Sequence, residues 1–303
     1  MVFFDDLETR SGDERAAELV DILPSQIARA KALDGYKTTL ADITARDITS
    51  ATALAQLPVL RKSVLSQAQG SASPLGGFTT RNVTGFGHIF QSPGPIYEPG
   101  GIEIDWWRMG RFLHACGIGS GDIVQNCFAY HLTPAGMIFE SGARAVGATV
   151  LPAGTGQTEL QVRAAVDIGT TAYAGTPDYL LAILEQGDAL GLDMSQLRHA
   201  FVSGGPLFPA MRQGYADRGI SCRQSYGTAD VGMVAYESLA MDGMIVDEEA
   251  IVEICTPGTG DPVPDGDIGE VVVTVFTPEF PLIRFATGDM SAVMPGSSPC
   301  GRT

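Results

Sequence analysis

The sequence is poor in positive charge. Among its 303 residues, lysine and arginine together number 19 against 35 aspartates and glutamates, which gives a formal net charge of −16. An acidic protein of this kind repels phosphate backbones and anionic lipid headgroups, so a nucleic-acid or membrane partner is disfavoured. We therefore expect a protein that acts on small molecules.

Long apolar runs are also missing. No stretch approaches the roughly 18 uninterrupted apolar residues that mark a membrane-spanning helix. The N-terminal stretch MVFFDDLETR is acidic, whereas a secretory signal peptide begins with basic residues. A cytoplasmic location is the default expectation.

Cysteines are few, odd in number and widely spaced, and no two form a Cys-x-x-Cys pair. The five are Cys116, Cys127, Cys222, Cys255 and Cys300. This spacing indicates neither a metal knuckle nor a redox motif. We predict buried thiols, because a free cysteine packs like a small hydrophobic residue.

Hydrophobic residues make up 45% of the chain, which is enough for one large or two modest cores. Near the N-terminus, apolar residues recur at helical spacing from Glu14 to about Leu33, and a second helical pattern runs over 50–57. We therefore predict a helical N-terminal cap over residues 1–68.

The central part, residues 69–240, has the pattern of an α/β core. It begins with a loop-like region over 69–101 that is rich in Gly, Ser, Pro and Thr. Short β-branched or apolar runs then alternate with helical patterns, as in DIVQNCFAY followed by PAGMIFESGARAVG. This alternation is typical of a mostly parallel sheet flanked by helices.

Close-spaced strand patterns occupy the last part, residues 241–303. The runs IVEICTPG, GEVVVTVFT and PLIRFAT are separated by turns rich in Gly, Pro and Asp. We predict an antiparallel β subdomain here, so the fold class is α/β with mostly parallel sheets plus an antiparallel part.

Four segments, in this order, form a recognisable set: FVSGGPLF, QSYGTADVG, PLIRFATGD and the terminal PCGR. Together they resemble the phenylacetate-CoA ligases, a branch of the AMP-forming, adenylate-forming acyl-CoA synthetase superfamily. Segments such as LPSQIARA and TELQVRAAVDIGTTAYAGTPDYL extend the resemblance over nearly the whole chain. It implies the large N-terminal domain of that fold, ending at the hinge.

The resemblance implies that the small C-terminal domain of the family is missing from this sequence. In the family that domain brings the adenylation lysine and much of the CoA site. The resemblance therefore implies a chain that binds nucleotide better than it turns it over.

The activity that the resemblance implies is that of an acid–thiol ligase. Such enzymes use ATP and magnesium to convert a carboxylic acid, here an aryl or other apolar acid of the phenylacetate type, to an acyl-adenylate. They then transfer the acyl group to coenzyme A and release AMP. A ligase for another acid, a relative that adenylates for a carrier protein, and a non-catalytic nucleotide- or acyl-binding relative remain alternatives. A homodimer is left open as the assembly state.

The segment SGGPL supplies the first candidate nucleotide contacts. Its residues Ser203, Gly204, Gly205 and Pro206 follow an apolar strand-like run. Glycine lacks Cβ, so the backbone could approach a flat adenine closely. A plain strand-to-helix turn explains the same residues equally well.

The segment SYGTADVG supplies the candidate catalytic centre. The resemblance implies that Tyr226 stacks on adenine, that Gly227 and Thr228 contact the nucleotide, and that Gly232 lies at the acid. Thr228 and Asp230 are the expected catalytic residues, with Asp230 as the magnesium ligand where the family usually has a glutamate. Aspartate is also a hard oxygen ligand, although it is shorter by one methylene.

Two further positions match nucleotide-binding residues of the family. Asp289 corresponds to the carboxylate that grips both ribose hydroxyls, which suits an ionised acceptor opposite two O–H donors. Arg302 corresponds to an arginine that contacts the nucleotide near the hinge. A Gly-Asp turn and an exposed terminal arginine are the simpler explanations.

Tyr130 and His131 fall at the end of a strand pattern, where α/β ligand sites tend to open. Relatives carry aromatic and glycine residues there that wall the acid pocket, so both are candidate substrate contacts. Packing explains either residue as well. Trp106 and Trp107 are expected in a helix, where they would pack rather than bind ligand.

The phosphate loop departs from its usual form, SSGTTGKP. The best counterpart is the stretch from Ser92 to Pro99, in which Ser92 and Gly94 fit as nucleotide contacts. The centre does not fit, since hydroxyls, a glycine and a lysine are replaced by Pro95, Ile96, Tyr97 and Glu98. Proline also removes an N–H from the phosphate nest, so we predict weak triphosphate binding or a different role for this loop.

A zinc site is the second departure. Many relatives hold zinc with a Cys, a His and a Cys-x-Cys, and the counterparts here are Ser238, Met244, Ser298 and Cys300. A structural zinc needs four such ligands around a tetrahedral ion. We predict no zinc.

Overall fold

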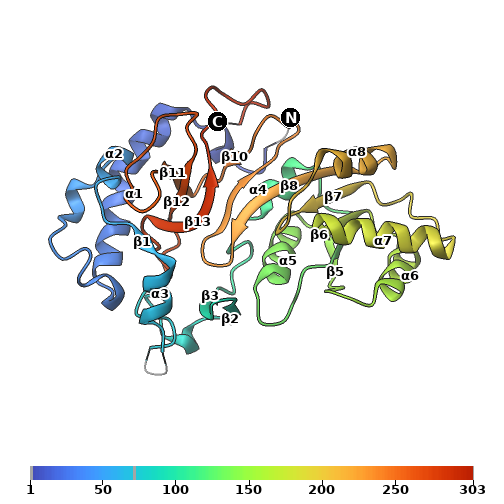
Figure 1. Ribbon diagram of the computed structural model, residues 1–303, viewed down its shortest axis with the longest axis horizontal. Coiled ribbons are helices and arrows are strands. Elements are labelled where there is room, and N and C mark those ends of the chain that lie inside the picture. The colour runs from blue at the N-terminus through green and yellow to red at the C-terminus, as the bar shows by residue number, and fades with distance from the viewer. Residues whose placement is uncertain (1–2, 71–72, 303) are drawn as a thin grey trace. The chain divides into compact units, whose positions relative to one another are not determined.

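The computed structural model describes residues 3–70 and 73–302, and these form two compact units. Unit 1 consists of the described residues up to Asp5 together with Glu103–Ile245. Unit 2 consists of Asp6–Ile102 and the described residues from Val246 onward. Along the described residues, the chain therefore passes from unit 1 to unit 2, back to unit 1 and again to unit 2, and the colours of Figure 1 let the reader follow this order.

Unit 1 is built on a seven-stranded sheet. In chain order its strands are β4 (Ile123–Asn126), β5 (Thr149–Leu151), β6 (Ala172–Gly175), β7 (His199–Val202), β8 (Ser221–Thr228), β9 (Gly232–Tyr236) and β10 (Ile245–Val246), of which the last extends one residue into unit 2. The spatial order is β10-β9-β8-β7-β6-β4-β5. Neighbours from β5 to β8 are parallel, and β9 is antiparallel to β8. The predicted parallel α/β core is confirmed.

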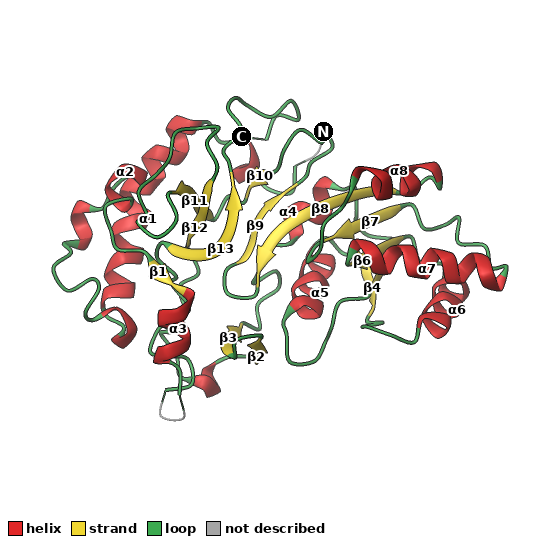
Figure 2. Cartoon of the chain, in the orientation of Figure 1, coloured by secondary structure: helices red, strands yellow, loops and turns green. Residues whose placement is uncertain are grey.

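Five helices accompany this sheet (Figure 2). They are α4 (Gly110–Ala115), α5 (Ala135–Ala145), α6 (Thr158–Ile168), α7 (Pro177–Leu190) and α8 (Pro209–Asp217). Proline occupies the first turn of α7 and α8, where its missing N–H costs no hydrogen bond. A left-handed glycine ends α6 and another ends α7, as expected for C-terminal caps. Helices α6 and α7 pack against each other, and Leu180 and Ile183 of α7 lie in the buried core.

The strand order places a topological switch point between β4 and β6. From β4 the chain crosses through α5 to β5 on one side, and then through α6 to β6 on the other. Parallel sheets of this kind bind ligands outside the carboxyl ends of the strands at such a point. The loops that follow β4, β6, β7 and β8 all leave from that edge.

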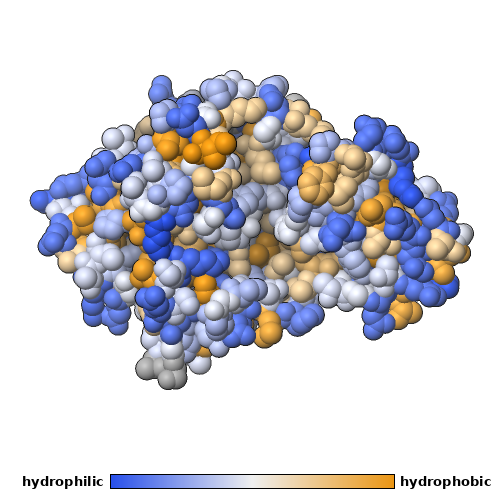
Figure 3. All heavy atoms as spheres, viewed as in Figure 1, coloured by the Kyte–Doolittle hydropathy of each residue, from blue (hydrophilic) through white to orange (hydrophobic). Residues whose placement is uncertain are grey.

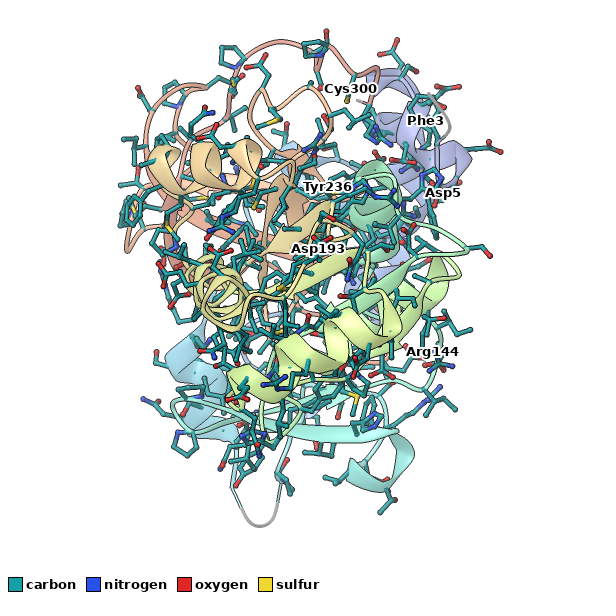
Figure 4. The ribbon with its side chains drawn as sticks, turned by 90° about the vertical axis from the view of Figure 1, so that its right-hand side faces the viewer. Phe3, Asp5, Arg144, Asp193, Tyr236 and Cys300 are labelled. Carbon is teal, nitrogen blue, oxygen red and sulfur yellow. The ribbon has the colours of Figure 1, made fainter. Side chains whose placement is uncertain are left out.

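Residues 3–5 belong to unit 1 because they dock on α4. The carboxylate of Asp5 accepts hydrogen bonds from Nε and Nη2 of Arg111, at 3.0 and 2.7 Å (Asp5 is labelled in Figure 4). The ring of Phe4 meets His114 edge-on at 5.8 Å between ring centroids.

Unit 2 combines the N-terminal helices with the C-terminal strands. The helices are α1 (Gly12–Lys31), α2 (Ala51–Leu54) and α3 (Lys62–Ala68). The sheet strands are β1 (Leu60–Arg61), β13 (Phe285–Ser291), β12 (Gly269–Val275) and β11 (Ala250–Cys255), in that spatial order. A separate hairpin is formed by β2 (His88–Ser92) and β3 (Ile96–Gly100).

The predicted antiparallel strands are present, with two differences in detail. The last strand begins at Phe285 rather than at residue 281. The edge strand β1 runs parallel to β13, which adds a parallel pair to the otherwise antiparallel sheet. The three-part division into a cap, a core and a β subdomain stays a prediction, and by contacts the N-terminal helices and C-terminal strands share one unit.

The helix expected around Trp106 and Trp107 is wrong. These residues lie in a turn ahead of α4, which starts only at Gly110. Asp105 and Arg108 have φ values of 59° and 63°, in the left-handed region that a right-handed helix excludes.

The five cysteines are buried and free, as predicted. Burial raises the pKa of the Cys222 thiol to about 12. In the described part of the chain, no helix is long and apolar enough to cross a membrane. Hydrophilic side chains spread over much of the face shown in Figure 3.

Candidate functional site

The carboxyl edge of the parallel sheet in unit 1 gathers most of the predicted site residues. Ser203 follows β7, and its Oγ donates a hydrogen bond to the carbonyl oxygen of Ser225 on β8, at 2.9 Å. The two strands are parallel, with Val202 opposite Gln224. The SGGP segment and the segment that begins at Tyr226 are therefore neighbours, although about twenty residues separate them in sequence.

The SGGP segment is open to solvent. Gly204, Gly205 and Pro206 are exposed, and Ser203 is half-buried. Gly204 has φ of 70°, which favours glycine, while a Cβ there would meet its nearest atoms only at 3.9 Å. The requirement for glycine at 204 therefore comes from backbone conformation, and the space beside the backbone is free for a flat ligand.

The turn between β8 and β9 is much tighter. A Cβ on Gly227 would lie 2.6 Å from the carbonyl oxygen of Gly232, and Gly232 itself has φ of 73°. Oγ1 of Thr228 accepts a hydrogen bond from the Val231 N–H at 3.3 Å and lies 3.5 Å from Oδ2 of Asp230. The turn thus places the two predicted catalytic side chains next to each other.

The carboxylate of Asp230 fits a magnesium ion in chemical type. Asp230 is only 4% exposed, and it offers hard oxygen atoms beside the Thr228 hydroxyl. Magnesium in nucleotide sites uses one or two carboxylates together with phosphate oxygens and water. Among the described residues no group of three or more His, Cys, Asp or Glu side chains could hold a metal ion. A magnesium ion here would therefore depend on the nucleotide for further ligands.

Tyr130 is part of a polar cluster at the end of β4. Nδ2 of Asn126 donates to the Tyr130 hydroxyl at 2.7 Å and to the carbonyl oxygen of Gly136 at 2.8 Å. Burial raises the pKa of Tyr130 above its ordinary value of 10, and the charge and hydrogen bond of Glu140 raise it further. The hydroxyl therefore stays neutral and engaged within the protein. His131, next in sequence, is exposed.

Asn126 and Gly136 lie beside the candidate residue Tyr130, and the sequence did not single them out. The Oδ1 atom of Asn126 also accepts from the Phe128 N–H at 3.2 Å, so one amide holds both ends of the loop. A Cβ on Gly136 would lie 2.7 Å from the carbonyl oxygen of Ala129 and 2.8 Å from the Tyr130 ring. A polar Asn at the end of an apolar strand was the only available sequence signal.

Unit 2 carries the remaining predicted residues. Asp289 is exposed near the end of β13, and its N–H donates to Oγ1 of Thr287 at 3.2 Å. The Thr287 hydroxyl in turn donates to the carbonyl oxygen of Val271 at 3.1 Å. These bonds fix the backbone that presents the Asp289 carboxylate.

Arg302 is not an exposed terminal residue. It is 2% exposed, and its Nε donates to a carboxylate oxygen of Glu8, which is itself fully buried. Glu8 and Arg302 are far apart in sequence, so this ion pair joins the first and last segments of unit 2. A buried pair of this kind is costly to break from one side, by about 3–5 kcal/mol.

The segment that corresponds to the phosphate loop is a paired hairpin. Ser92 lies opposite Ile96, which leaves only Pro93, Gly94 and Pro95 in the turn. The side-chain amide of Gln69 donates to the Tyr97 carbonyl oxygen and accepts from the Tyr97 N–H, both at 2.7 Å. Glu98, at the position of the family lysine, is fully buried.

The four counterparts of the zinc ligands are divided between the units. Ser238 and Met244 lie in unit 1, whereas Ser298 and Cys300 lie in unit 2 with Oγ and Sγ 3.1 Å apart. The absence of zinc stays a prediction.

The fold and this arrangement define a class of protein. An open conformation of 2-hydroxyisobutyryl-CoA ligase, in complex with 2-HIB-AMP and CoA, matches 98% of this chain with a TM-score of 0.90 and 23% identity, and the match covers 69% of that chain. The anthranilate CoA ligase AuaEII, in complex with anthranoyl-AMP, matches 68% of this chain and 45% of its own with a TM-score of 0.54 and 19% identity. The chain therefore shares its fold with these CoA ligases.

Sequence comparison finds relatives of higher identity than these solved structures. Phenylacetate-coenzyme A ligase of Aromatoleum evansii is 34% identical over 203 residues, which are 64% of this chain and 46% of that enzyme. The phenylacetate-coenzyme A ligase of Escherichia coli K12 is also 34% identical, over 210 residues that are 65% of this chain and 47% of the enzyme. The predicted resemblance to phenylacetate-CoA ligases is confirmed, and the chain spans about half the length of these curated relatives. No family model matches the chain.

Proposed function

We propose that this chain carries the nucleotide- and acid-binding part of an AMP-forming acid–CoA ligase that acts on an aryl or other apolar carboxylic acid. The observation that carries the proposal is the junction at the carboxyl edge of unit 1. There the Ser203–Ser225 hydrogen bond joins the open SGGP segment to the turn that holds Thr228 and Asp230. The similarity to phenylacetate-CoA ligases supports this choice of reaction.

The reaction has two steps. A carboxylate oxygen of the acid attacks the α-phosphorus of ATP, a new P–O bond forms, and the bond to pyrophosphate breaks. The thiolate of CoA then attacks the acyl carbon of the adenylate, and AMP leaves with the electron pair of the broken C–O bond. When bound, a magnesium ion supplies charge stabilisation for the departing pyrophosphate.

Several of the predicted residues have a role in holding these groups. The SGGP backbone and the Tyr226 ring contact adenine, and the exposed Asp289 carboxylate accepts from the ribose hydroxyls. Asp230, beside Thr228, is the carboxylate for magnesium. The Tyr130 ring, whose hydroxyl is engaged by Asn126, offers the acid an apolar wall. Such a wall favours aryl and apolar acids over hydroxy acids.

Pyrophosphate release tests the proposal. We expect the 303-residue chain with ATP, magnesium and a panel of acids to release pyrophosphate slowly, and faster with aryl acids than with hydroxy acids. Asp230→Asn should reduce the rate by about tenfold or more, because a metal carboxylate is lost. Asp167→Asn, at an exposed position of α6, is the matched control and should leave the rate unchanged.

The β2–β3 hairpin favours a second candidate, a relative that binds nucleotide without adenylating an acid. Its turn holds two prolines and one glycine in place of a phosphate nest. AMP binding without pyrophosphate release for any acid would indicate this candidate. Absence of both AMP binding and release would contradict both functions.

A further inference from the structure

A short segment before α4 has an unusual backbone that its neighbours enforce. Asp105 and Arg108 are both left-handed, which costs roughly 1–2 kcal/mol for each residue with a side chain. The Asp105 carboxylate accepts from the Gly110 N–H at 2.9 and 3.0 Å, and the Asp105 carbonyl oxygen accepts from the Arg108 N–H at 2.7 Å. Oγ of Ser141 on α5 accepts from the Asp105 N–H at 2.7 Å. Hydrogen bonds to the segment therefore hold it in this left-handed conformation.

Two successive residues of this segment, Trp107 and Arg108, hydrogen-bond to the β8–β9 turn. We call these contacts the grip. The carbonyl oxygen of Trp107 accepts from the Met233 N–H at 3.1 Å. Nη2 of Arg108 donates to the carbonyl oxygens of Val231 and Met233, at 2.5 and 3.1 Å. Arg108 is 8% exposed, so these bonds form away from bulk water, where they are strongest.

The grip brackets Gly232 and needs it to be glycine. A Cβ on Gly232 would lie 3.0 Å from the Trp107 carbonyl oxygen, and its φ of 73° already favours glycine. The closest bonded carbonyl belongs to the peptide group that joins Val231 to Gly232, one peptide group beyond the Asp230–Val231 peptide. The Asp230–Val231 peptide is held from the other side, because the Val231 N–H donates to Oγ1 of Thr228 at 3.3 Å. The two bonds together limit how the backbone between Asp230 and Gly232 can rotate. The Arg108 guanidinium thus holds the backbone near Asp230, the candidate magnesium ligand. It can do so without contact with the substrate.

We propose that Arg108 is a positioning residue that holds the Thr228–Gly232 turn so that Asp230 can bind magnesium–nucleotide. The metal part of this proposal rests on the proposed function. The grip itself does not, because it is a property of the turn alone. Residues that orient a metal ligand typically change metal affinity by about 10–100-fold when they are replaced.

The variants are Arg108→Lys, which keeps one cationic donor, and Arg108→Met, which keeps the length of the side chain without donors. Arg163→Met is the control, because Arg163 is exposed on α6 and forms a local ion pair with Glu159. Hydrogen exchange, read by mass spectrometry on peptides that span 226–236, reports the turn without any ligand. Calorimetric titration of ATP at a series of magnesium concentrations reports the metal dependence.

We expect faster exchange in 226–236 for both Arg108 variants and wild-type exchange for Arg163→Met. The magnesium concentration for half-maximal effect should rise about tenfold in Arg108→Met and less in Arg108→Lys. In an Asp230→Asn background, Arg108→Lys should add nothing to the loss of the magnesium effect, since both changes act through one carboxylate. If Arg108→Met does not fold, Arg108→Lys carries all three readouts.

Unchanged hydrogen exchange of the 226–236 peptides in the Arg108 variants would show that Arg108 does not hold the turn. Faster exchange with an unchanged magnesium dependence would overturn the positioning role, as would full additivity with Asp230→Asn. A wild-type chain that binds no adenine nucleotide at any magnesium concentration would remove the proposed function and the metal role with it. The exchange experiment would then still decide whether Arg108 holds the turn.

Discussion

Two glycines determine the shape of the turn that carries Thr228 and Asp230. A side chain on Gly227 would collide with the Gly232 carbonyl oxygen, which is backbone and cannot rotate away. Gly232 is needed both for its backbone conformation and for the approach of Trp107. The position of the candidate catalytic residues therefore depends in part on neighbours that have no functional groups of their own.

Replacing Gly227 with alanine should displace the turn. A Cβ at 2.6 Å from a backbone oxygen forces strand β8 or β9 to shift, so we expect a loss of stability of about 1–3 kcal/mol. Gly214→Ala is the matched control, because Gly214 is exposed on α8 with nothing within 4 Å of an added Cβ. Urea unfolding should show the control equal to the wild type or slightly more stable. Equal stability of Gly227→Ala and Gly214→Ala would contradict this account.

His199, at the start of β7, should make stability depend on pH. Burial lowers the pKa of His199 below its ordinary value of 6.5, Asp122 opposes this shift, and Arg198 and Arg223 add to it. The folded chain therefore prefers neutral His199. Its contribution is present above pH 6.5 and is lost as the pH falls through the lowered pKa. We expect the free energy of unfolding to fall between about pH 7 and pH 5.

His199→Asn should make that fall shallower, because the group that gains a proton on unfolding is removed. His88→Asn, at an exposed position of β2, should keep the wild-type slope. Urea titrations at several pH values give both slopes. An identical slope for His199→Asn and the wild type would show that His199 is not responsible.

The sequence was sufficient to predict Thr228, Asp230, Ser203 and Asp289 as candidates, because each stands in a local motif. It was not sufficient for Asn126 or Arg108. Arg108 acts on carbonyl groups of residues 231 and 233, more than a hundred positions away. Such a contact exists only once the sheet has formed, so no local sequence pattern predicts it.

At the scale of elements, the β2–β3 hairpin is the clearest departure from a phosphate-binding loop. The strands pair up to Ser92 and Ile96, and Gln69 occupies both backbone groups of Tyr97. Pro93 and Pro95 have no N–H to donate. Only the Gly94 N–H remains within the turn, which is too little for the β- and γ-phosphates.

Because of the hairpin, we expect the chain to lack the usual higher affinity for ATP than for AMP. We expect calorimetry on the 303-residue chain to give an ATP affinity no higher than that for AMP, because the added phosphates gain few donors in a chain of net charge −16. Pro95→Ser restores an N–H and adds a hydroxyl, and it should improve ATP binding more than AMP binding. Micromolar ATP affinity, clearly tighter than that of AMP, would contradict the hairpin's proposed effect.

The parallel part of the fold could be predicted because each βαβ segment is local, and its alternating pattern is legible in the sequence. The turn at Trp106 and Trp107 could not be predicted, because its left-handed residues depend on Ser141 and on the β8–β9 turn. The start of β13 was misplaced for a similar reason. Residues 281–283 are apolar and buried and Arg284 is buried as well, yet the antiparallel pairing of β13 with β12 begins only at Phe285.

At the scale of the whole molecule, segments from the two ends of the described sequence pack together within unit 2. Unit 2 joins α1 to the C-terminal sheet through Gln26, whose Nε2 donates to the Val275 carbonyl oxygen at 2.8 Å. The hydroxyl of Tyr36 donates to the Pro281 carbonyl oxygen at 3.0 Å and accepts from the Ile283 N–H at 3.0 Å. These contacts span nearly 250 residues, so the two ends of the described sequence contribute to one compact unit.

The central claim is that this chain binds an adenine nucleotide through the predicted residues, and calorimetric titration with AMP tests it most directly. We predict one AMP per chain and a loss of about tenfold or more in Asp289→Asn, since charge-assisted hydrogen bonds to ribose are weakened. Asp265→Asn, exposed in the same unit, should bind AMP like the wild type. No AMP binding at millimolar concentrations, or equal affinity of Asp289→Asn and the wild type, would contradict the claim.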